Sequence, residues 1–414
     1  MGITTVRAVN RLTTRWVRQA VTGEEGTVLT AAGIWPLLAF LADGAGGPAR
    51  TELAETLGIP AESATAAARE LLGGLAGVRG LRAATGLWTH ADLPLHEAWR
   101  SGLPDGARST LTGDEDTDRA ALDAWTADRT GGLIGRLPAL LEEETPLLLA
   151  SALALRLKWA EPFRELPCRH ARGPWQGRML RGLYRTASTP DLVRVTAGGT
   201  TDTVTTLEVA GADEVDVHLV LGEPHTAPGD VLAAGLASVT GAAASVGAGS
   251  LTEERPGPGL TVHTVDAYGP EPVLHIAAVA FTVRAEHDLL QRARLFGLEA
   301  ASDEERGHFP GISPEPSAVR SARQCAVAAF TATGFEAAAV TAVAARRGGG
   351  PPPRPTCRAR RAEVSFDRPF GFLAVHRTSG LVLAAGWVSD PDPLPVPAHR
   401  SSGGVTSRPW SARR

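Results

Sequence analysis

The segment Gly334–Arg347 reads GFEAAAVTAVAARR, and the interpretation of the whole chain depends on it. If it forms a strand, one face carries Phe335, Ala337, Ala339, Thr341, Val343 and Ala345, and the other carries Glu336, Ala338, Val340, Ala342, Ala344 and Arg346. The small side chains in its middle would let such a strand fit between two neighbours. Three glycines and three prolines follow at 348–353 and cannot continue a central strand. The sequence therefore predicts a strand-forming segment that ends at two arginines and a loop.

The composition indicates a globular protein. The chain has 414 residues, of which 43% are hydrophobic and 21% are charged, so one large domain or two ordinary ones could form a core. The net charge is −4, which gives no basic field that would favour nucleic acid. No apolar run approaches the length of a membrane span. We expect neither nucleic acid nor membrane as a partner.

The sequence contains no motif of a known catalytic or metal site. It lacks the nucleophile elbow, the zinc-protease helix motif, the P-loop and the dinucleotide-binding glycine pattern. The cysteines Cys168, Cys325 and Cys357 are widely spaced and odd in number, so they predict neither a disulfide framework nor a zinc site. We therefore expect no enzymatic activity, no cofactor and no metal.

The order of predicted elements is typical of an α+β fold. Apolar residues recur at helical spacing in the first 76 residues, whereas alternation dominates after residue 190. The run 146–157 is apolar throughout, and its pattern is compatible with a strand or a helix. Predicted helices cover 5–20, 34–44, 48–57, 62–76, 95–102, 118–132, 229–240 and 287–298. Predicted strands cover 81–90, three segments within 190–222, 261–263, 273–283, 324–330, 364–366, 370–376 and 381–388.

Five stretches, two of which overlap at 307–313, resemble the serpin family. They are GTVLTAAGIWPLLAFLADGAGGPARTELAETLGI (26–59), LASALALRLKWAEPF (149–163), FTVRAEHDLLQRARLFGLEAASDEERGHFPGIS (281–313), GHFPGISPEPSAVRSARQCAVAAFTATGFEAAAVTAV (307–343) and VSFDRPFGFLAVHRTSGLVLAAGWVSDP (364–391). The resemblance is collinear over residues 5–391 and indicates a single domain and a bacterial-type member. Residues 392–414 are rich in Pro, Ser, Gly and Arg, which predicts a disordered tail.

The resemblance implies both an architecture and a function. The fold would place N-terminal helices around a large central antiparallel sheet, with smaller sheets and an exposed reactive-centre loop at about 334–361. The protein would be a metastable, monomeric suicide inhibitor of a serine protease, which attacks the loop and forms a covalent acyl complex. The cleaved loop would then enter the large sheet as a new strand. The alternative is a non-inhibitory protein of the same fold, acting as a protease substrate or an interaction module.

The resemblance also assigns roles within the opening segment. Gly334 would be the hinge, where free dihedral angles help the strand to turn over. The insertion segment would continue through Phe335, Glu336, Ala337, Ala338, Ala339, Val340 and Thr341. Phe335 stands at the first inward position, where the family has a small residue. A closed gap would have to accept its ring, so we expect slower insertion and more cleavage as a substrate.

Other positions correspond to the region where the sheet would open. Trp159 matches the family's tryptophan, and Thr30, Gly33, Ser151 and Gln324 stand where the family has serines, asparagine and histidine. These replacements predict that the sheet opens with a different ease.

The scissile bond is assigned by counting along the loop. Counting forward from Gly334 places it near Arg347–Gly348, with Arg346 beside it, whereas counting back from Pro369 places it near Arg358. Arginine at this position suits a trypsin-like protease. The arginine-rich segment 354–361 is interpreted as a solvated basic loop or as a site for a polyanion or an acidic exosite. The family resemblance favours an extracellular location, but no clear signal peptide is present, which leaves the cytoplasm open.

Overall fold

Helices form in the N-terminal part because apolar side chains recur there on one helical face. The computed structural model describes residues 1–142, 145–197, 203–252, 256–304, 307–335 and 357–395. Helix α1 buries Val6, Val9, Leu12 and Trp16 on a single face. The helices are α1 (Ile3–Ala20), α2 (Ala31–Gly44), α3 (Gly47–Leu57), α4 (Ala61–Ala76), α5 (Glu97–Gly102), α6 (Glu115–Thr130), α7 (Pro228–Val239) and α8 (Ala293–Phe296), with 3-10 turns at Pro190–Leu192, Ala248–Ser250, Leu290–Arg292 and Ala300–Ser302.

The large sheet has the strand order β3-β2-β4-β15-β16-β5, and β14 also pairs with β15. Its strands are β2 (Leu81–His90), β3 (Arg108–Leu111), β4 (Leu147–Leu155), β5 (Leu157–Lys158), β14 (Phe281–Asp288), β15 (Val319–Phe330) and β16 (Gly334–Phe335). The apolar run near residue 150 is therefore a strand, and all of its residues are buried. The pairing is mainly antiparallel, but β2 and β3 run parallel, and so do β4 and β15.

Two further sheets complete the fold. A seven-stranded sheet has the order β1-β19-β18-β10-β9-β8-β11, and a five-stranded sheet has the order β12-β17-β13-β7-β6. The first contains β1 (Thr27–Leu29), β8 (Val193–Thr196), β9 (Val204–Val209), β10 (Val215–Leu221), β11 (Ser245–Gly247), β18 (Phe370–His376) and β19 (Leu381–Val388). The second contains β6 (Arg164–Arg169), β7 (Met179–Ala187), β12 (Leu260–Ala267), β13 (Val273–Val279) and β17 (Cys357–Ser365).

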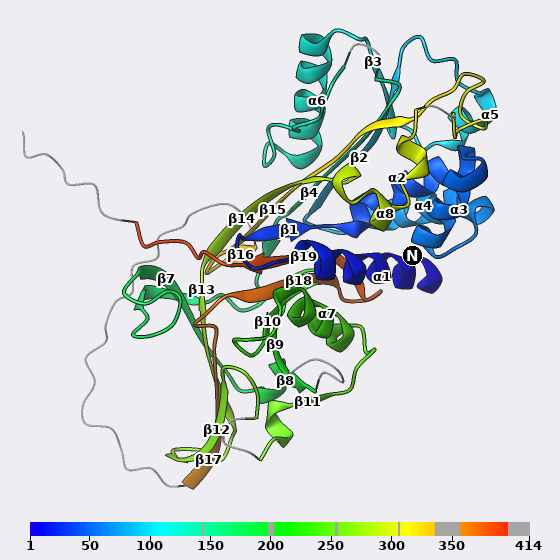
Figure 1. The fold of residues 1–414 in the computed structure, drawn as a ribbon. Helices are drawn as coiled ribbons and strands as arrows, with labels where there is room; N and C mark the ends of the chain where they lie inside the picture. Colours follow the sequence, from blue (N-terminus) through cyan, green and yellow to red (C-terminus); the bar gives the residue numbers. More distant parts are fainter. Residues whose placement is uncertain (143–144, 198–202, 253–255, 305–306, 336–356, 396–414) are drawn as a thin grey trace, which may run out of the picture.

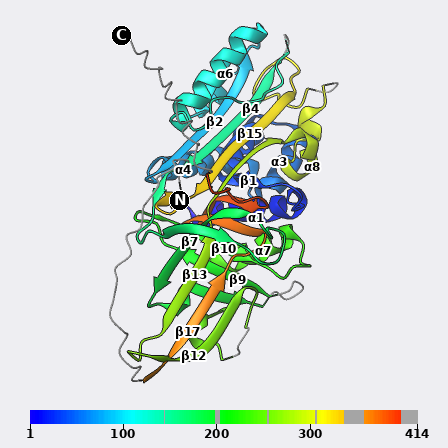
Figure 2. The same ribbon diagram turned by 90° about the vertical axis from the view of Figure 1, so that its left-hand side faces the viewer.

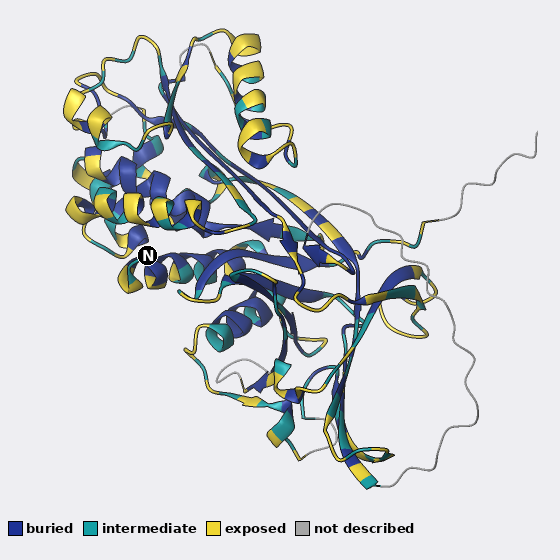
Figure 3. Ribbon diagram, turned by 180° about the vertical axis from the view of Figure 1, so that it is seen from behind, coloured by how far each residue is buried: buried dark blue, intermediate teal, exposed yellow. Residues whose placement is uncertain are grey.

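The helices cover the sheets in separate groups. Helices α2, α3 and α4 gather at one side of the large sheet, and α6 lies across β2 and β4 on the other (Figures 1 and 2). Helices α1 and α7 pack on the seven-stranded sheet through β19 and β18. The strands between these layers are mostly buried, while the outer faces of the helices are exposed (Figure 3). The predicted α+β class, with helices around a large sheet and smaller sheets, is confirmed.

Several predicted boundaries are wrong. The predicted strand 273–283 is divided at Ala280 into β13 and β14, which belong to different sheets. Residues 287–298 are not one helix, because β14 continues to Asp288 with inward Phe281 and Val283 alternating with exposed neighbours. The arginine-rich segment is not a loop to residue 361, since β17 begins at Cys357. The fold does not end at 391 either, because the amide of Leu394 donates a hydrogen bond to the carbonyl of Met179. Among the described residues, no helix is both long and apolar enough to cross a membrane.

Candidate functional site

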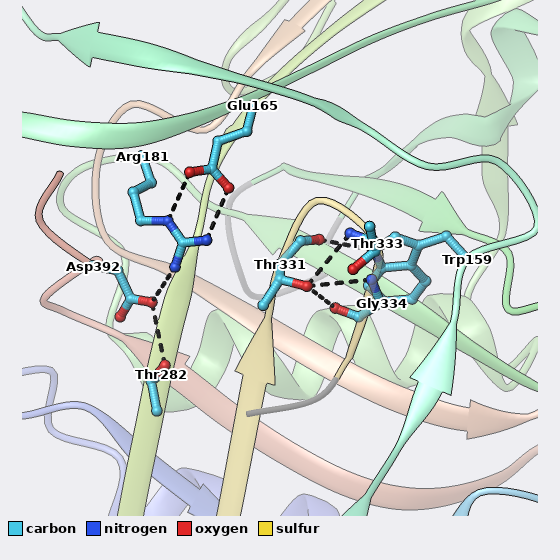
Figure 4. Close-up of polar contacts among 8 residues, drawn as sticks. All are labelled: Trp159, Glu165, Arg181, Thr282, Thr331, Thr333, Gly334 and Asp392. Carbon is cyan, nitrogen blue, oxygen red and sulfur yellow. Dashed lines mark hydrogen bonds and ion pairs between the residues drawn. The ribbon is translucent and has the colours of Figure 1, made fainter. Parts of the chain in front are cut away.

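The chain reverses direction directly after β15, in a tight turn that we call the hinge turn (Thr331–Phe335). The amide and the hydroxyl of Thr331 donate to the carbonyl of Gly334 at 2.8 and 3.0 Å, and the Gly334 amide donates to the same hydroxyl at 3.3 Å. The Trp159 indole donates to the Thr331 carbonyl at 2.9 Å, and the Trp159 amide donates to that of Thr333 at 3.1 Å (Figure 4). The hinge turn is therefore held from within and by the strand end opposite.

Beyond this turn, the first two residues of the predicted insertion segment already pair with the sheet. Phe335 pairs antiparallel with Phe330 of β15 on one side and with Leu157 of β5 on the other. Gly334 pairs with Lys158. Gly334 and Phe335 therefore form the short strand β16 between β15 and β5. Strand β5 follows β4 directly in the chain, after Arg156.

The ring of Phe335 is fully buried within an aromatic cluster. Its centroid lies 5.8 Å from that of Phe372, 6.4 Å from that of Trp159 and 6.5 Å from that of Phe330. The inward orientation is as the sequence predicts. The prediction that this ring slows insertion assumed a closed gap, but the space between β15 and β5 already holds the side chain. The effect of Phe335 on the rate of insertion stays a prediction. Phe335 anchors the hinge turn.

Gly334 is needed for a reason that the sequence did not reveal. Its φ angle is not positive, so the left-handed region that favours glycine is not used. A Cβ atom here would lie 2.0 Å from the carbonyl oxygen of Leu157 and 3.3 Å from the Cα of Lys158. These are backbone atoms of β5 and cannot turn aside. Close approach of two strands, and not dihedral freedom, therefore requires glycine at this position.

Below the hinge turn, β4 and β15 close the sheet by pairing with each other. They run parallel from the Val319–Leu147 pair to the Val327–Ala154 pair. A strand that follows β15 and turns back can be antiparallel to both of them, as β16 already is. Many facing residues are small, among them Ala150, Ala152, Ala322 and Ala326. This pair of strands is the place where a further strand could enter.

The predicted polar cluster (Thr30, Gly33, Ser151 and Gln324) is brought together across this closed pair. The Gln324 amide oxygen accepts from the Thr30 backbone amide at 2.8 Å, and its nitrogen donates to the Thr30 carbonyl at 2.8 Å. The same nitrogen lies 3.5 Å from the Ser151 hydroxyl. A Cβ atom at Gly33 would lie 2.4 Å from that hydroxyl. The polar cluster thus links the start of α2 to both strands, whereas Trp159 belongs to the hinge turn.

Replacing Gln324 with Met is expected to lower the free energy of unfolding by about 2–4 kcal/mol. Both backbone groups of Thr30 would lose their partner while Thr30 is 1% exposed, and each unsatisfied buried group costs about 1–3 kcal/mol. Denaturant unfolding measures the change. Ser151→Ala is the control, with an expected loss below about 1 kcal/mol because its contact with Gln324 is long. Equal losses in the two variants would contradict the assignment.

His287 of β14 lies beside the polar cluster, opposite Gln324. Its Nε2 forms a hydrogen bond with the Val28 carbonyl at 2.9 Å, and its ring packs edge-on against Trp16 at 5.2 Å. Burial lowers the pKa of His287 below its usual value, against a raising effect of the Val28 hydrogen bond and with a further lowering by Arg292. The imidazole is therefore neutral in the folded protein at neutral pH.

Acidification below about pH 6.5 is expected to destabilise the native state through this histidine. The folded protein binds fewer protons than the unfolded one below that pH, so this stability is complete above pH 6.5 and is lost as the pH falls. Thermal unfolding at pH 7.5 and 5.5 measures the loss. The His287→Gln variant should show a smaller difference between the two pH values; an identical difference would assign the effect to other groups.

A second polar set, which we call the clamp (Glu165, Arg181, Thr282 and Asp392), fixes the end of the fold around the buried Arg181. Arg181 donates two hydrogen bonds to Glu165 at 2.9 and 2.8 Å and lies 3.6 Å from Asp392, which accepts from Thr282 at 3.2 Å (Figure 4). The hydrogen bond with Glu165 raises the pKa of Arg181, and burial raises that of Asp392. The clamp joins β6, β7 and β14 to the chain beyond β19. Its partners are too far apart in sequence for pattern analysis to pair them.

The arginines after the loop lie in β17 and not in a loop. Arg358 pairs with Asp266 of β12, and Arg361 pairs with His263 of β12 and Val273 of β13. Arg360 donates to the Gly249 carbonyl at 3.1 Å. Arg358 is exposed, but its backbone is already paired with β12, whereas a protease pairs with the backbone of the segment that it cleaves, so the structure favours Arg347 over Arg358.

The remaining predicted site residues lie outside the described residues. They are Glu336, Ala337, Ala338, Ala339, Val340, Thr341, Arg347 and Gly348. Within the part of the chain that the structure describes, no group of three metal-binding side chains occurs. The sequence reasoning missed Thr331 and the clamp. Thr331 carried one signal, since a threonine three residues before a glycine can close a turn with its hydroxyl.

Comparison with known proteins relates this arrangement to one family. The family model described as Serpin (serine protease inhibitor) matches residues 7–172, and no curated protein matches the chain. Serpin48 of the insect Tenebrio molitor is 18% identical with a TM-score of 0.68, covering 94% of this chain and 98% of its own. Native protease nexin-1 with heparin is 15% identical, with a TM-score of 0.70 and coverage of 94% and 100%. Human thyroxine-binding globulin complexed with thyroxine is 16% identical, with a TM-score of 0.70 and coverage of 94% and 98%.

Proposed function

Because this chain has the serpin fold and its residues 7–172 match the serpin family model, we propose that it is a suicide inhibitor of a trypsin-like serine protease. Serpins usually inhibit proteases, and they are generally inhibitors and not catalysts. The observation that carries the proposal for this chain is the position of Gly334 and Phe335. They already form an antiparallel pair between β5 and β15, at the head of the β4–β15 pair.

Insertion would extend this existing strand. After cleavage of the loop, the residues that follow Phe335 continue in the same direction, antiparallel to β15 and β4. Each inserted residue replaces one backbone pairing between β4 and β15 with two pairings, one to β4 and one to β15. Small residues in 337–345 match the small residues of the two strands, so the new strand meets few steric conflicts. The contact between Gln324 and Ser151 has to break when the strands separate.

The chemical step belongs to the protease. Its serine oxygen attacks the carbonyl carbon of Arg347 and forms an ester, while the bond to the nitrogen of Gly348 breaks and a free amino group leaves. Insertion then moves the ester-linked protease away before water can hydrolyse the ester. An arginine at the cleaved bond fits a pocket with a buried aspartate, which is why the trypsin-like class is named. The backbone pairing of Arg358 within β17 supports Arg347 as the reactive residue.

Incubation with trypsin tests the proposal. We expect a covalent complex that survives SDS, together with release of a fragment that begins at Gly348. Arg347→Ala should abolish the complex with trypsin, whereas Arg358→Ala, the matched control, should leave it unchanged. Complete cleavage at Arg347 without any complex would refute inhibition and would support the alternative, a non-inhibitory serpin-fold protein that acts as a substrate or an interaction module.

A polyanion or an acidic exosite of the protease is a second proposed partner, at the arginines of β17. The observation in its favour is that Arg358 is exposed, while the similar protease nexin-1 was solved with heparin. Addition of heparin to the trypsin reaction should accelerate complex formation at low salt. The Arg358→Ala variant should lose part of this acceleration, and an unchanged acceleration would argue against β17 as the binding site.

A further inference from the structure

A pocket of about 390 Å³ lies at the end of α7, over β8, β9 and β10, on the seven-stranded sheet. It is separate from the hinge turn, the polar cluster and the clamp, and Figure 1 shows α7 above these strands. Its polar wall consists of Arg194, Thr206, Glu208, His218, Ser238 and Ser245. None of these residues has a part in loop insertion, so their gathering in one pocket needs another explanation.

Strand register places the wall residues on one face. Arg194 of β8 stands opposite Thr206 of β9, and Glu208, two residues further along β9, stands opposite His218 of β10. Higher on this face, α7 packs so closely that a Cβ atom at Gly235 would lie 2.7 Å from the Val220 side chain. The helix ends at Val239, and the face opens there. The pocket therefore lies on the same face of the sheet that α7 covers, just beyond the end of that helix.

Three of the wall groups have polar atoms without partners. Thr206 is 3% exposed, and its buried hydroxyl makes no hydrogen bond within the described part of the chain. Most buried hydroxyl groups in proteins are hydrogen-bonded, and this one faces the pocket with its hydrogen-bonding capacity unused. Neither the Glu208 carboxylate nor the His218 imidazole has a hydrogen-bond or ion-pair partner among the described residues. By contrast, the neighbouring hydroxyls of Thr196 and Ser238 bond to each other at 2.8 Å.

The charges of the wall are complementary but separate. Glu208 carries a pKa raised by burial and by Asp216, and the charges of Arg377 and Arg194 act in the opposite direction. Asp216 is occupied by Arg377, at 2.6 and 2.8 Å. Arg194 donates to Ser245 through Nε and Nη2, at 2.8 and 3.1 Å, which leaves Nη1 for another partner. Burial lowers the pKa of His218 to about 4, so its ring is uncharged at neutral pH.

We propose that this pocket binds a small zwitterion of the α-amino acid class, with its ammonium group at Glu208, its carboxylate at Arg194 and a hydrogen bond to Thr206. Diagonal neighbours on adjacent strands lie about 7–8 Å apart, which leaves room for a ligand that carries both charges. The carbonyl end of α7 adds partial negative charge and favours the ammonium group. The neutral His218 and the Ser238 hydroxyl offer hydrogen bonds to an uncharged polar side chain.

Calorimetric titration of the full chain with L-serine and with L-glutamine tests the site. We expect saturable binding of at least one of them, with a Kd of about 1 mM or lower. Ethanolamine and glycerate each lack one of the two charges of serine and should bind at least about tenfold more weakly. Glu208→Gln and Thr206→Val should each weaken binding of the amino acid about tenfold or more. Glu55→Gln, an exposed glutamate on α3, is the matched control and should bind like the wild type.

The proposal is overturned if neither amino acid binds, if ethanolamine or glycerate binds as tightly as serine, or if both pocket variants keep wild-type affinity. Thermal unfolding of each variant verifies that it is folded, and Thr206→Val keeps the volume of the side chain while it removes the unpartnered hydroxyl. Because binding is measured directly and without a protease, the result does not depend on whether the chain inhibits one.

Discussion

Cleavage of the loop between Phe335 and Cys357 is expected to raise the midpoint of thermal unfolding by about 10–30 °C. An inserted strand of ten or so residues breaks the pairing of β4 with β15 but pairs with both, a net gain of about one backbone hydrogen bond per residue. At about 0.5–1.5 kcal/mol for each bond, the gain is about 5–15 kcal/mol. At about 2 °C for each kcal/mol in a chain of this size, that gain gives the stated rise.

The measurement compares the intact and the cleaved chain after brief proteolysis, removal of the protease and identification of the cut by mass spectrometry. A truncated chain that ends at Pro395 is the control, because it loses residues without a free loop end and should keep the original midpoint. A cleaved chain that melts at the same temperature as the intact chain would show that the sheet does not accept the loop. Inhibition by strand insertion would then be excluded for this protein.

The position of the hinge turn gives the native state a defined starting point for this change. Phe335 is held by the rings of Phe372, Trp159 and Phe330, and Thr331 closes the turn beside it. Further insertion would have to separate β4 from β15, which breaks their backbone pairing and the contact between Gln324 and Ser151. We therefore expect the barrier to insertion to lie at the polar cluster and not at Phe335.

Sequence patterns predict the elements of this fold better than their pairing. Helical spacing in 5–20 and alternation in 204–221 correspond closely to α1, β9 and β10, because each element buries one face. The parallel pairing of β4 with β15 does not follow from pattern, since β4 is buried on both faces and shows no alternation. Strand β17 was predicted only at its end, 364–366, because the arginines before it were taken as solvated, although Ala359, Ala362 and Val364 are buried.

For the site, family resemblance identified residues whose physical roles only the structure reveals. Gln324 and Ser151 are brought together as expected, and Trp159 lies at the hinge turn instead. Gly334 was assigned as the hinge, but its need for glycine comes from contact with β5, a segment far away in sequence. The clamp depends on residues as distant as Arg181 and Asp392, and nothing in either local sequence indicates the other.

Replacing Gly334 with Val is expected to convert the proposed inhibitor into a substrate. The new Cβ atom would stand 2.0 Å from the Leu157 carbonyl oxygen, so β16 has to leave its place between β5 and β15. Phe335 would leave the aromatic cluster with it, at a cost of up to about 3–5 kcal/mol. Insertion would then lack its first paired residues, Gly334 and Phe335. The proposed cleavage site, thirteen residues after Gly334, is unchanged.

After cleavage, insertion of the loop competes with hydrolysis of the acyl-enzyme. In the Gly334→Val variant we expect the ratio of hydrolysis to insertion to rise by tenfold or more. This rise corresponds to a change of about 1.4 kcal/mol or more in the relative barriers of the two steps. Titration of residual trypsin activity measures this ratio, and SDS gels should show cleaved chain in place of the complex. Gly135→Val is the matched control, because that glycine has open space around its Cβ position and no positive φ. A Gly334→Val variant that inhibits trypsin at the wild-type ratio would contradict the role of the hinge turn, since the steric conflict with Leu157 leaves no way to insert in the observed register.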